Sequence, residues 1–172
     1  MARESIVLFG EGKTEAIFLN HLKKVYEADK DKRLKIKVDK GQGKSPQDVA
    51  NRLVNKLLKL GCYDRSLLLI DSDIEHKIKS AFLKKNSITL ALSVPQCLEG
   101  LMLSILGELP KGGLHSSSKE LKSAFIKLLN TDEAGYSMKL RSRCPQLFPK
   151  ELLEAKRSTL PEFDAILNFM GV

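Results

Sequence analysis

The stretch that decides the fold of this chain is Ser66-Leu67-Leu68-Leu69-Ile70-Asp71-Ser72-Asp73. Its unbroken apolar run predicts a strand that is buried on both faces, as in a parallel sheet. Asp71 and Asp73 fall at or just beyond the carboxyl end of this strand, where open α/β sheets bind ligands. Residues two apart in an extended segment point to the same side, so the two carboxylates would repel each other unless a cation lay between them. A turn with helix-capping aspartates accounts for the same residues, and the stretch by itself leaves both interpretations open.

The totals describe a soluble globular protein of one domain, residues 1–172, with 42% hydrophobic and 29% charged residues. No apolar run approaches the roughly 20 residues that a membrane span needs. The chain enters its first predicted strand directly, so no signal peptide is visible. Cys62, Cys97 and Cys144 are widely separated and have neither CxxC nor zinc-site spacing, which favours buried reduced thiols. We therefore expect a cytoplasmic protein with no membrane association.

The charge balance favours a polyanionic partner. The formal net charge is +8 and the isoelectric point about 9.4. Nucleic acid is the partner that this excess of lysine and arginine predicts first. Solvated lysine-rich faces are the ordinary alternative, and charge alone does not separate the two.

Strands and helices alternate along the first two-thirds of the chain. Apolar patterns predict strands at residues 5–9, 34–38, 66–70 and 87–92, and helices at 14–28, from a Ser45 cap to Gly61, at 74–85, and from Pro95 through Ile105. The alternating pattern of residues 34–38 is typical of a half-exposed edge strand. The predicted buried stripes are Val49, Leu53, Leu57 and Leu60 in the second helix, and Ile78, Ala81 and Phe82 in the third. This order predicts an α/β fold with a mostly parallel central sheet flanked by helices, whose core spans about residues 1–107.

Beyond Gly107 the pattern predicts a helical C-terminal part, about residues 108–172. Capping boxes at Ser117–Glu120 and Thr159–Glu162 would each open a helix. The segment 131–149 between them lacks a clear apolar period, and we expect it to be irregular.

A nucleotide-binding P-loop is suggested by Gly10-Glu11-Gly12-Lys13-Thr14 but is not supported by its spacing. That loop needs a glycine five residues before its Gly-Lys-Thr, because its backbone curls around phosphate. Val7, inside the predicted strand, occupies this position. The sequence therefore argues against an ATP site here.

Carboxylates gather at one predicted edge of the sheet. Glu11 and Glu15 lie four residues apart at a helix start, at the same sheet edge as Asp71 and Asp73, and Glu99 follows the last strand. Acids in a first helical turn also complement the helix dipole, which is the simpler explanation of each one alone. Five converging carboxylates would repel one another without a metal, and oxygen-only ligands suit Mg²⁺ or Mn²⁺.

Five motifs together resemble a known family. In chain order they are Glu11-Gly12-Lys13-Thr14-Glu15 with Phe18; Gly41-Gln42-Gly43-Lys44-Ser45-Pro46; Asp71-Ser72-Asp73 with Glu75 and His76; Ser93-x-Pro95 with Glu99; and Tyr136-Ser137-Met138-Lys139. The set resembles the TOPRIM domain of topoisomerases, primases and OLD-type nucleases, and most closely its RloB-like branch. The resemblance covers residues 1 to about 107 and extends weakly beyond them.

This resemblance implies metal-dependent hydrolysis of phosphodiesters, with two ions about 3.5–4 Å apart. The implied metal ligands are Glu11, Glu15, Asp71, Asp73 and Glu99. The implied catalytic residues are Glu11, Asp71, Asp73, Glu99 and Lys139. The expected nucleic-acid contacts are Lys13, Lys44, Arg141 and Arg143. We interpret His21, on the middle of a helix face, as structural.

Three functions compete at this stage. The first is a TOPRIM nuclease working with a separate ATPase in a defence system, as the resemblance implies; DNA is expected as its nucleic-acid partner ahead of RNA, although the sequence does not decide between them. The second is a non-catalytic nucleic-acid-binding or assembly subunit that kept the fold. The third is a phosphoryl-transfer enzyme for a small substrate. The acidic set favours the first over the second, and the net charge favours these two over the third; the oligomeric state stays open.

Overall fold

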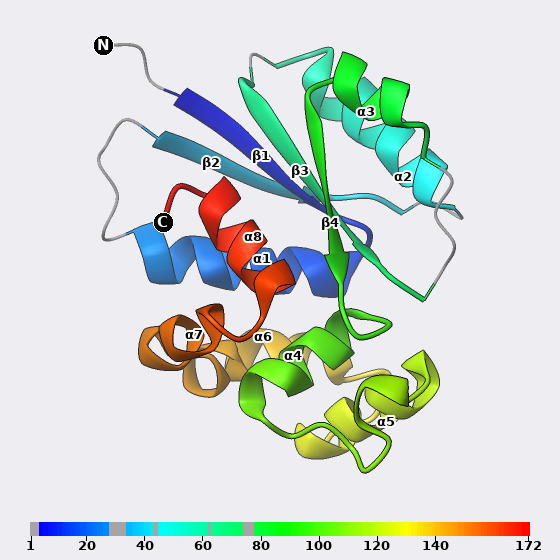
Figure 1. Ribbon diagram of the computed structural model, residues 1–172, viewed down its shortest axis with the longest axis vertical. Coiled ribbons are helices and arrows are strands. Elements are labelled where there is room, and N and C mark those ends of the chain that lie inside the picture. The colour runs from blue at the N-terminus through cyan, green and yellow to red at the C-terminus, as the bar shows by residue number, and fades with distance from the viewer. Residues whose placement is uncertain (1–3, 28–33, 43–44, 62, 74–77) are drawn as a thin grey trace.

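The computed structural model describes residues 4–27, 34–42, 45–61, 63–73 and 78–172 (Figure 1). Its sheet contains β1 (Glu4–Gly10), β2 (Leu34–Lys40), β3 (Arg65–Asp71) and β4 (Ile88–Ser93) in the order β2-β1-β3-β4, and every described strand pairing is parallel. The predicted α/β class and the edge position of β2 are both confirmed. The central strands β1 and β3 are apolar and almost wholly buried, whereas β2 alternates between buried and exposed residues.

Eight α-helices lie within the described residues. They are α1 (Lys13–Glu27), α2 (Pro46–Leu53), α3 (Ser80–Lys85), α4 (Leu98–Leu106), α5 (Ser118–Leu128), α6 (Tyr136–Leu147), α7 (Lys150–Arg157) and α8 (Pro161–Phe169). A π-helical turn (Val54–Leu58) extends α2, and a 3₁₀ turn (Gly113–His115) precedes α5. None of these helices is long and apolar enough to span a membrane.

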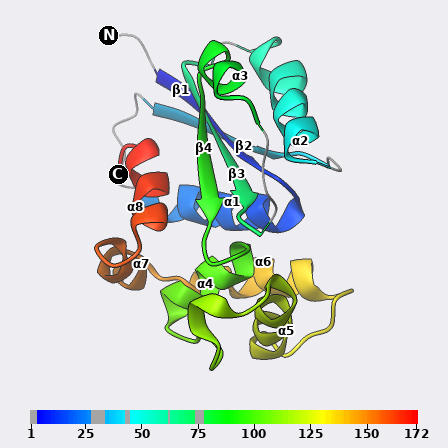
Figure 2. The ribbon, with the colours of Figure 1, turned by 45° about the vertical axis from the view of Figure 1, so that its right-hand side comes forward.

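Two apolar clusters cover the two faces of the sheet. One face packs against α2 and α3 through residues such as Val7, Leu53 and Leu68. The other packs against α1 and α8, and its cluster continues without a break into α4, α5, α6 and α7. Figures 1 and 2 show these last four helices as a layer beneath the C-terminal ends of β3 and β4. The C-terminal helices therefore share their core with the sheet.

Two predicted helix caps are confirmed and one is wrong. The side chain of Ser45 accepts a hydrogen bond from the Asp48 amide, and Ser117 forms a complete capping box with Glu120. Thr159 does not cap α8. Its hydroxyl instead donates to the Lys156 carbonyl, and the helix begins with Pro161, whose fixed φ suits a first helical position.

The expectation that residues 131–149 are irregular is wrong, because α6 occupies most of this segment. Leu140 and Cys144, four residues apart, are its buried residues, and the helix lies against α1. The Phe148 ring that follows α6 packs edge-on against Phe18 of α1, with ring centres 5.5 Å apart. Its three basic residues and an internal proline obscure the apolar pattern and give a weak local signal, so packing against α1 is what stabilises this helix.

Two predicted buried positions are exposed. Leu60 is 82% exposed because the π-helical turn changes the helical period: the Lys59 amide bonds the Val54 carbonyl, five residues back. Ala81 is exposed because α3 starts at Ser80, so residues 78 and 79 do not share its period; Ile78 is buried and Phe82 half-buried, as predicted. The start of the third predicted helix, residues 74–77, lies outside the described residues.

The helix predicted from Pro95 begins three residues later, at Leu98. Residues 94–97 form a tight bend in which the Cys97 amide bonds the Pro95 carbonyl at 2.6 Å. No side chain of the bend caps the helix. Its cap comes from the sheet, because Asp71 Oδ1 accepts a hydrogen bond from the Leu98 amide at 3.0 Å.

We expect Leu53→Ala to lower the free energy of unfolding by about 2–5 kcal/mol, because this fully buried side chain would leave a cavity between α2 and the sheet. The same truncation at exposed Leu60 should cost less than about 0.5 kcal/mol. Urea unfolding of the two variants measures both values. Equal destabilisation would mean that Leu60 is packed after all.

Candidate functional site

Two glutamates are positioned by the tight turn between β1 and α1. A side chain at Gly10 would meet Glu15 Cβ at 2.5 Å, so glycine at this position lets the first turn of α1 fold back onto the strand end. The Glu11 amide donates to the Leu69 carbonyl at 3.0 Å, which continues the sheet by one residue. Glu11 Oε2 accepts a 3.2 Å hydrogen bond from the Asp71 amide. The ends of β1 and β3 are thus tied together by an acidic side chain.

Glu15 is a buried carboxyl group, 8% exposed. Its Oε2 accepts a 2.8 Å hydrogen bond from the Gly12 amide at the start of α1. Burial raises the pKa of Glu15 from 4.5 to about 7; its backbone hydrogen bonds oppose this rise, and the nearby charges of Glu99 and Glu11 add to it. In the absence of a cation, Glu15 is about half protonated near neutral pH.

Asp71 ends β3 and contacts both helices that follow the sheet. Its Oδ1 accepts from the Leu98 amide of α4 at 3.0 Å, and its Oδ2 lies 3.7 Å from Lys122 Nζ of α5. Burial raises the pKa of Asp71 from 3.8 to about 7; Glu15 and Glu99 add to the rise, and Lys122 opposes it. Asp71 therefore joins Glu15 as a second carboxyl group that titrates near neutral pH.

Glu99 lies in the first turn of α4 and is buried, 5% exposed. The Tyr136 hydroxyl, at the start of α6, donates to Glu99 Oε1 at 2.8 Å. Burial, followed by the charge of Glu99, raises the pKa of Tyr136, so its phenol stays protonated and holds this carboxylate in place. Burial opposes the charge on Lys122, but Asp71 and Glu99 outweigh it and raise the lysine's pKa.

A buried hydroxyl without a partner lies beside Asp71. Ser93 ends β4 and pairs with Asp71 in the parallel register, so both side chains leave the same face of the sheet. Among the described residues, Ser93 Oγ is the fully buried side-chain oxygen that has no hydrogen-bond partner. Such a group normally binds a water molecule or another polar species, which indicates a polar occupant at this edge.

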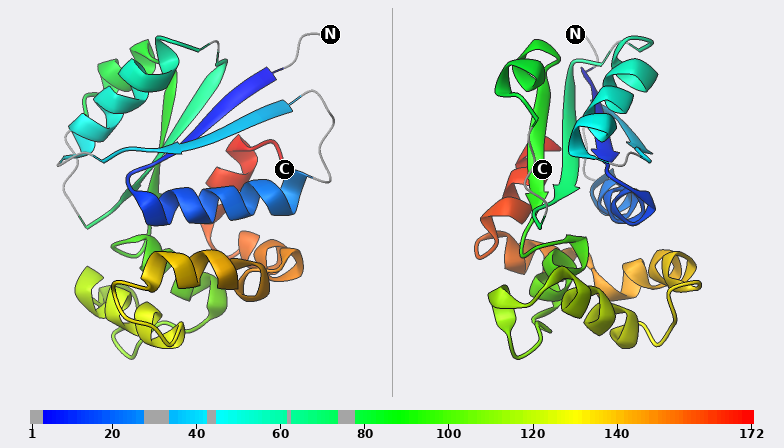
Figure 3. Two further views of the ribbon diagram at one scale, coloured as in Figure 1. Left: turned by 180° about the vertical axis from the view of Figure 1, so that it is seen from behind. Right: turned by 90° about the vertical axis from the view of Figure 1, so that its right-hand side faces the viewer.

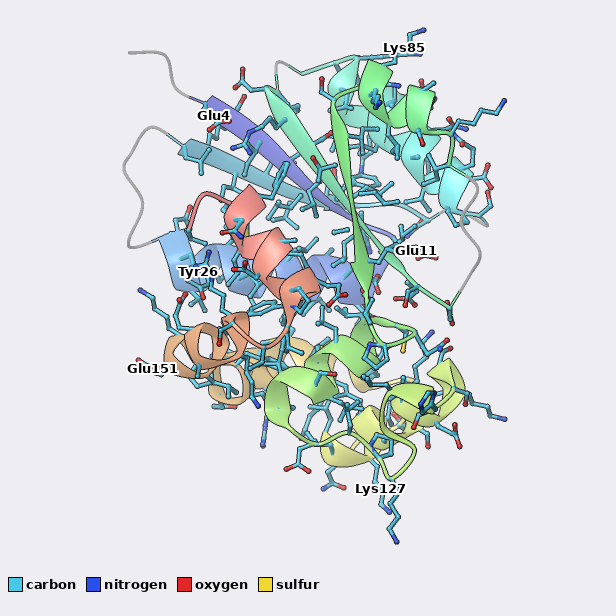
Figure 4. All side chains as sticks on the ribbon, in the orientation of Figure 1. Glu4, Glu11, Tyr26, Lys85, Lys127 and Glu151 are labelled. Carbon is cyan, nitrogen blue, oxygen red and sulfur yellow. The ribbon has the colours of Figure 1, made fainter. Side chains whose placement is uncertain are left out.

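The structure places four of the five predicted metal ligands at one end of the sheet. Glu11, Glu15, Asp71 and Glu99 lie at the C-terminal edge of the sheet, and Figure 4 shows Glu11 at the end of β1 opposite Glu4. Asp73 does not share the buried position of Asp71. Because β3 ends at Asp71, the two-residue alternation of side chains stops there, and Asp73 lies exposed in the following bend. Its charge still contributes to the raised pKa of Lys122.

The predicted basic contacts divide into separate places. Lys13 and Arg141 line a groove beside α1, whereas Lys139 is half-buried on α6 and Arg143 is exposed outside that groove. Lys44, like Glu75, His76 and Cys62, lies outside the described residues. His21 is structural as expected: it is buried and its Nε2 lies 2.8 Å from the Phe148 carbonyl oxygen. The thiols Cys97 and Cys144 are free and buried, also as expected.

The acidic site fits a hard divalent cation in its chemistry. Its donor atoms are carboxylate oxygens, and a hydroxyl without a hydrogen-bond partner lies beside them. Two of the carboxyl groups, Glu15 and Asp71, have raised pKa values. No three His, Cys, Asp or Glu side chains of the described residues are grouped closely enough to hold a metal ion by themselves. Mg²⁺ commonly uses one or two carboxylates and completes its shell with water and phosphate oxygens. Glu11 and Asp71, joined at the sheet edge, are the pair that fits this arrangement best.

Sequence reasoning missed two side chains of this site. Lys122 lies on α5, where nothing in the surrounding sequence distinguishes it from other exposed lysines, and it reaches Asp71 because α5 packs on α4. Tyr136 belongs to the Tyr-Ser-Met-Lys motif, and here the motif did carry a signal. The motif predicted Lys139 as a catalytic residue, whereas it is the tyrosine hydroxyl that donates a hydrogen bond to Glu99.

No protein-family model matches this chain, and neither a curated protein nor a solved structure matches it.

We predict that the metal-free protein becomes less stable as the pH rises from about 4.5 to 7. In this window folded Glu15 and Asp71 retain protons that the unfolded chain has already released, and stability falls with pH wherever the folded state binds more protons. Raising the pKa of Glu15 from 4.5 to about 7 corresponds to on the order of 3 kcal/mol at pH 8.

Urea unfolding in EDTA at pH 5 and pH 8 measures this effect for the wild type and Glu15→Gln. The comparison matters because burial lowers the pKa of His21, which gives an opposite slope in both proteins. The glutamine variant should lose less stability than the wild type between the two pH values. Identical pH profiles would show that Glu15 is not a buried acid.

Proposed function

We propose that this protein is a metal-dependent phosphodiesterase that hydrolyses nucleic acid. The observation that carries the proposal is the coupled set of Glu15, Asp71 and Glu99, together with Glu11, at the carboxyl edge of a parallel sheet. Three of these side chains are largely buried. Buried acids whose negative charge is not fully neutralised by nearby cations destabilise the folded state, so such a group indicates a functional site. A cation between them would offset the burial and the mutual repulsion that raise the pKa values of Glu15 and Asp71.

Each residue of the site has a distinct part in this proposal. Glu11 and Asp71 would hold Mg²⁺ or Mn²⁺ at the strand ends. Glu15 and Glu99, which are more deeply buried, would accept protons or hold water near the ion. The bound ions would supply an activated water and stabilise the leaving oxygen.

Two neighbouring side chains support this set. Tyr136 fixes the Glu99 carboxylate through a 2.8 Å hydrogen bond. The ammonium group of Lys122, 3.7 Å from Asp71, offsets negative charge at the sheet edge and can approach a substrate phosphate.

The resemblance to TOPRIM domains supports the same reaction, because the motifs that carry it supply Glu11, Glu15, Asp71 and Glu99. Its RloB-like branch further suggests a cytoplasmic defence component that works with an ATPase in trans. The short β1–α1 connection is consistent with a separate ATPase. Glu11 and Gly12 are the residues between the strand and the helix, which is too short for a loop that encircles phosphate.

A non-catalytic subunit with the same fold is the second candidate. The observation that favours it is that the described residues do not assemble a three-ligand metal group. Such a subunit would bind nucleic acid through its basic surface and use the acidic edge for assembly. The two candidates differ in whether metal binds and whether phosphodiesters are cleaved.

We expect Mg²⁺ or Mn²⁺ to raise the melting temperature at pH 7.5. A ligand at a hundred times its Kd stabilises the folded state by about 2.7 kcal/mol, or about 5–10 °C for a chain of this size. A Glu11→Gln/Asp71→Asn variant should lose this response, and at pH 5 the wild-type response should weaken because protonated carboxyls bind metal poorly. Glu151→Gln, at an exposed position of α7 far from the site, is the control for the loss of one negative charge elsewhere (Figure 4). No shift with up to about 10 mM metal would argue against the site.

We expect wild-type protein to cleave labelled DNA or RNA in the presence of Mn²⁺, alone or with an ATPase encoded beside it. Asp71→Asn keeps an oxygen that can accept from the Leu98 amide but removes the charge, and it should slow cleavage by at least about 100-fold, about 3 kcal/mol of barrier. Glu151→Gln should cleave as the wild type does. Equal rates in all three proteins would identify a contaminant, and no cleavage under any condition would favour the non-catalytic subunit.

A further inference from the structure

A basic groove runs along the face of α1 that lies opposite buried Glu15. It has a volume of about 460 Å³ and is bounded by α1, the end of β2 and α6. The residues that matter here are Lys13, Asn20 and Lys24 from α1, Asp39 and Lys40 from β2, and Arg141 from α6. Figure 3, left, shows α1 with β2 on one side and α6 on the other. We call this the α1–α6 groove.

The α1–α6 groove carries an excess of free positive charge. Lys13, Lys24 and Arg141 are exposed, and no acidic side chain of the described residues pairs with them or with Lys40. Asp39 is the acid of the groove, and it is already neutralised by Lys56 at 2.9 Å. Four cations without an acidic partner among the described residues surround one hollow, which favours a polyanionic occupant.

The cations are spaced along a line that starts at the acidic edge. Lys13 follows Glu11 by two residues, and Lys24 lies 11 residues further along the same helix, so about 16 Å separate them at 1.5 Å per residue. This distance is several times the roughly 3.4 Å axial rise per nucleotide of duplex DNA, so Lys13 and Lys24 would contact different phosphates of one strand. An anionic chain lying in the groove would therefore have one end at Glu11.

The lining of the groove favours contacts to a backbone. Lysine ammonium groups are compact charges that bind phosphate without fixing a base. The described lining includes no phenylalanine, tyrosine or tryptophan, the side chains on which bases stack, and its one imidazole, His21, is buried. The volume is that of a small-molecule site and too small to enclose a duplex.

We propose that the α1–α6 groove binds the phosphate backbone of a single nucleic-acid strand, without base preference, and leads it to the acidic edge. The inference rests on the proposed function for the identity of the polyanion. It selects Lys24 and Lys40 in addition to Lys13 and Arg141, and it excludes Arg143 although that residue lies on the same helix.

The test compares two charge-reversed double variants that change the net charge equally. Lys24→Glu/Arg141→Glu alters the groove, whereas Lys111→Glu/Lys127→Glu alters exposed positions outside it; Figure 4 shows Lys127 far from Glu11. Binding of a labelled twelve-nucleotide oligothymidine is measured by fluorescence anisotropy in EDTA, across a salt series. Removing metal separates binding from cleavage, and unchanged melting temperatures verify that the variants fold. If the reversal variant unfolds, Lys24→Gln/Arg141→Gln replaces it.

The groove variant should bind at least about tenfold more weakly, and its salt slope should fall by about 1.4, or 0.7 for each lost single-strand phosphate contact. The control variant should bind like the wild type, and oligoadenosine and oligocytidine should bind like oligothymidine. Equal losses in both variants would overturn the groove, because net charge alone would then explain binding. Polyglutamate binding as tightly as the oligonucleotide, or a tenfold base preference, would also overturn it.

The same measurements separate this inference from the proposed function. Glu11→Gln should keep full oligonucleotide affinity in EDTA, because the acidic edge is not part of the groove. Groove-dependent binding by a wild type that never cleaves supports the groove and refutes the nuclease. Cleavage by a groove variant whose oligonucleotide affinity is unchanged refutes the groove and leaves the nuclease standing.

Discussion

The hydrogen bond and the ion pair of the Asp71 carboxylate join the sheet to the helices beneath it. One oxygen caps α4 through the Leu98 amide, and the other faces Lys122 of α5. The backbone amide of the same residue donates to Glu11, which ties β3 to the end of β1. A single residue thus connects two strands and two helices, so the positions of Glu99 and Tyr136 depend on it as well.

The site is retained at a cost to the metal-free protein. Burial and mutual repulsion raise the pKa values of Glu15 and Asp71 to about 7, so the folded state opposes their ionisation at physiological pH. Lys122 compensates part of this charge from a half-exposed position. Ser93 adds a buried hydroxyl without a partner. Local instability of this kind concentrates at functional sites, where a ligand restores the balance.

Helix α1 separates two opposite electrostatic environments. Glu15 on its buried face contributes to the acidic edge, whereas Lys13 and Lys24 on its outer face contribute to the α1–α6 groove. Part of the positive charge behind the formal net charge of +8 therefore lies in this groove, next to a cluster of negatively charged side chains. A substrate chain attracted by the cations would meet the carboxylates at the first turn of the same helix.

Local sequence was sufficient for the features that depend on short-range patterns. The apolar runs of β1 and β3, the alternation of β2 and the caps at Ser45 and Ser117 follow from neighbouring residues, and the structure has all of them. Because parallel strands present their carboxyl ends at one edge, the approach of Glu11, Glu15 and Asp71 was also predictable.

Tertiary packing decided what local patterns do not encode. Helix α6 forms because Leu140 and Cys144 pack on α1, although its sequence has little apolar periodicity. The start of α4 is set by an aspartate 27 residues earlier, and Leu60 leaves the buried stripe because a π-helical turn changes the period. Lys122, Tyr136 and the cations of the α1–α6 groove come from separate elements. The sequence specifies the types of these side chains, but they come close together only when the helical layer packs against the sheet. Contacts between segments that are distant in the chain leave no pattern among neighbouring residues.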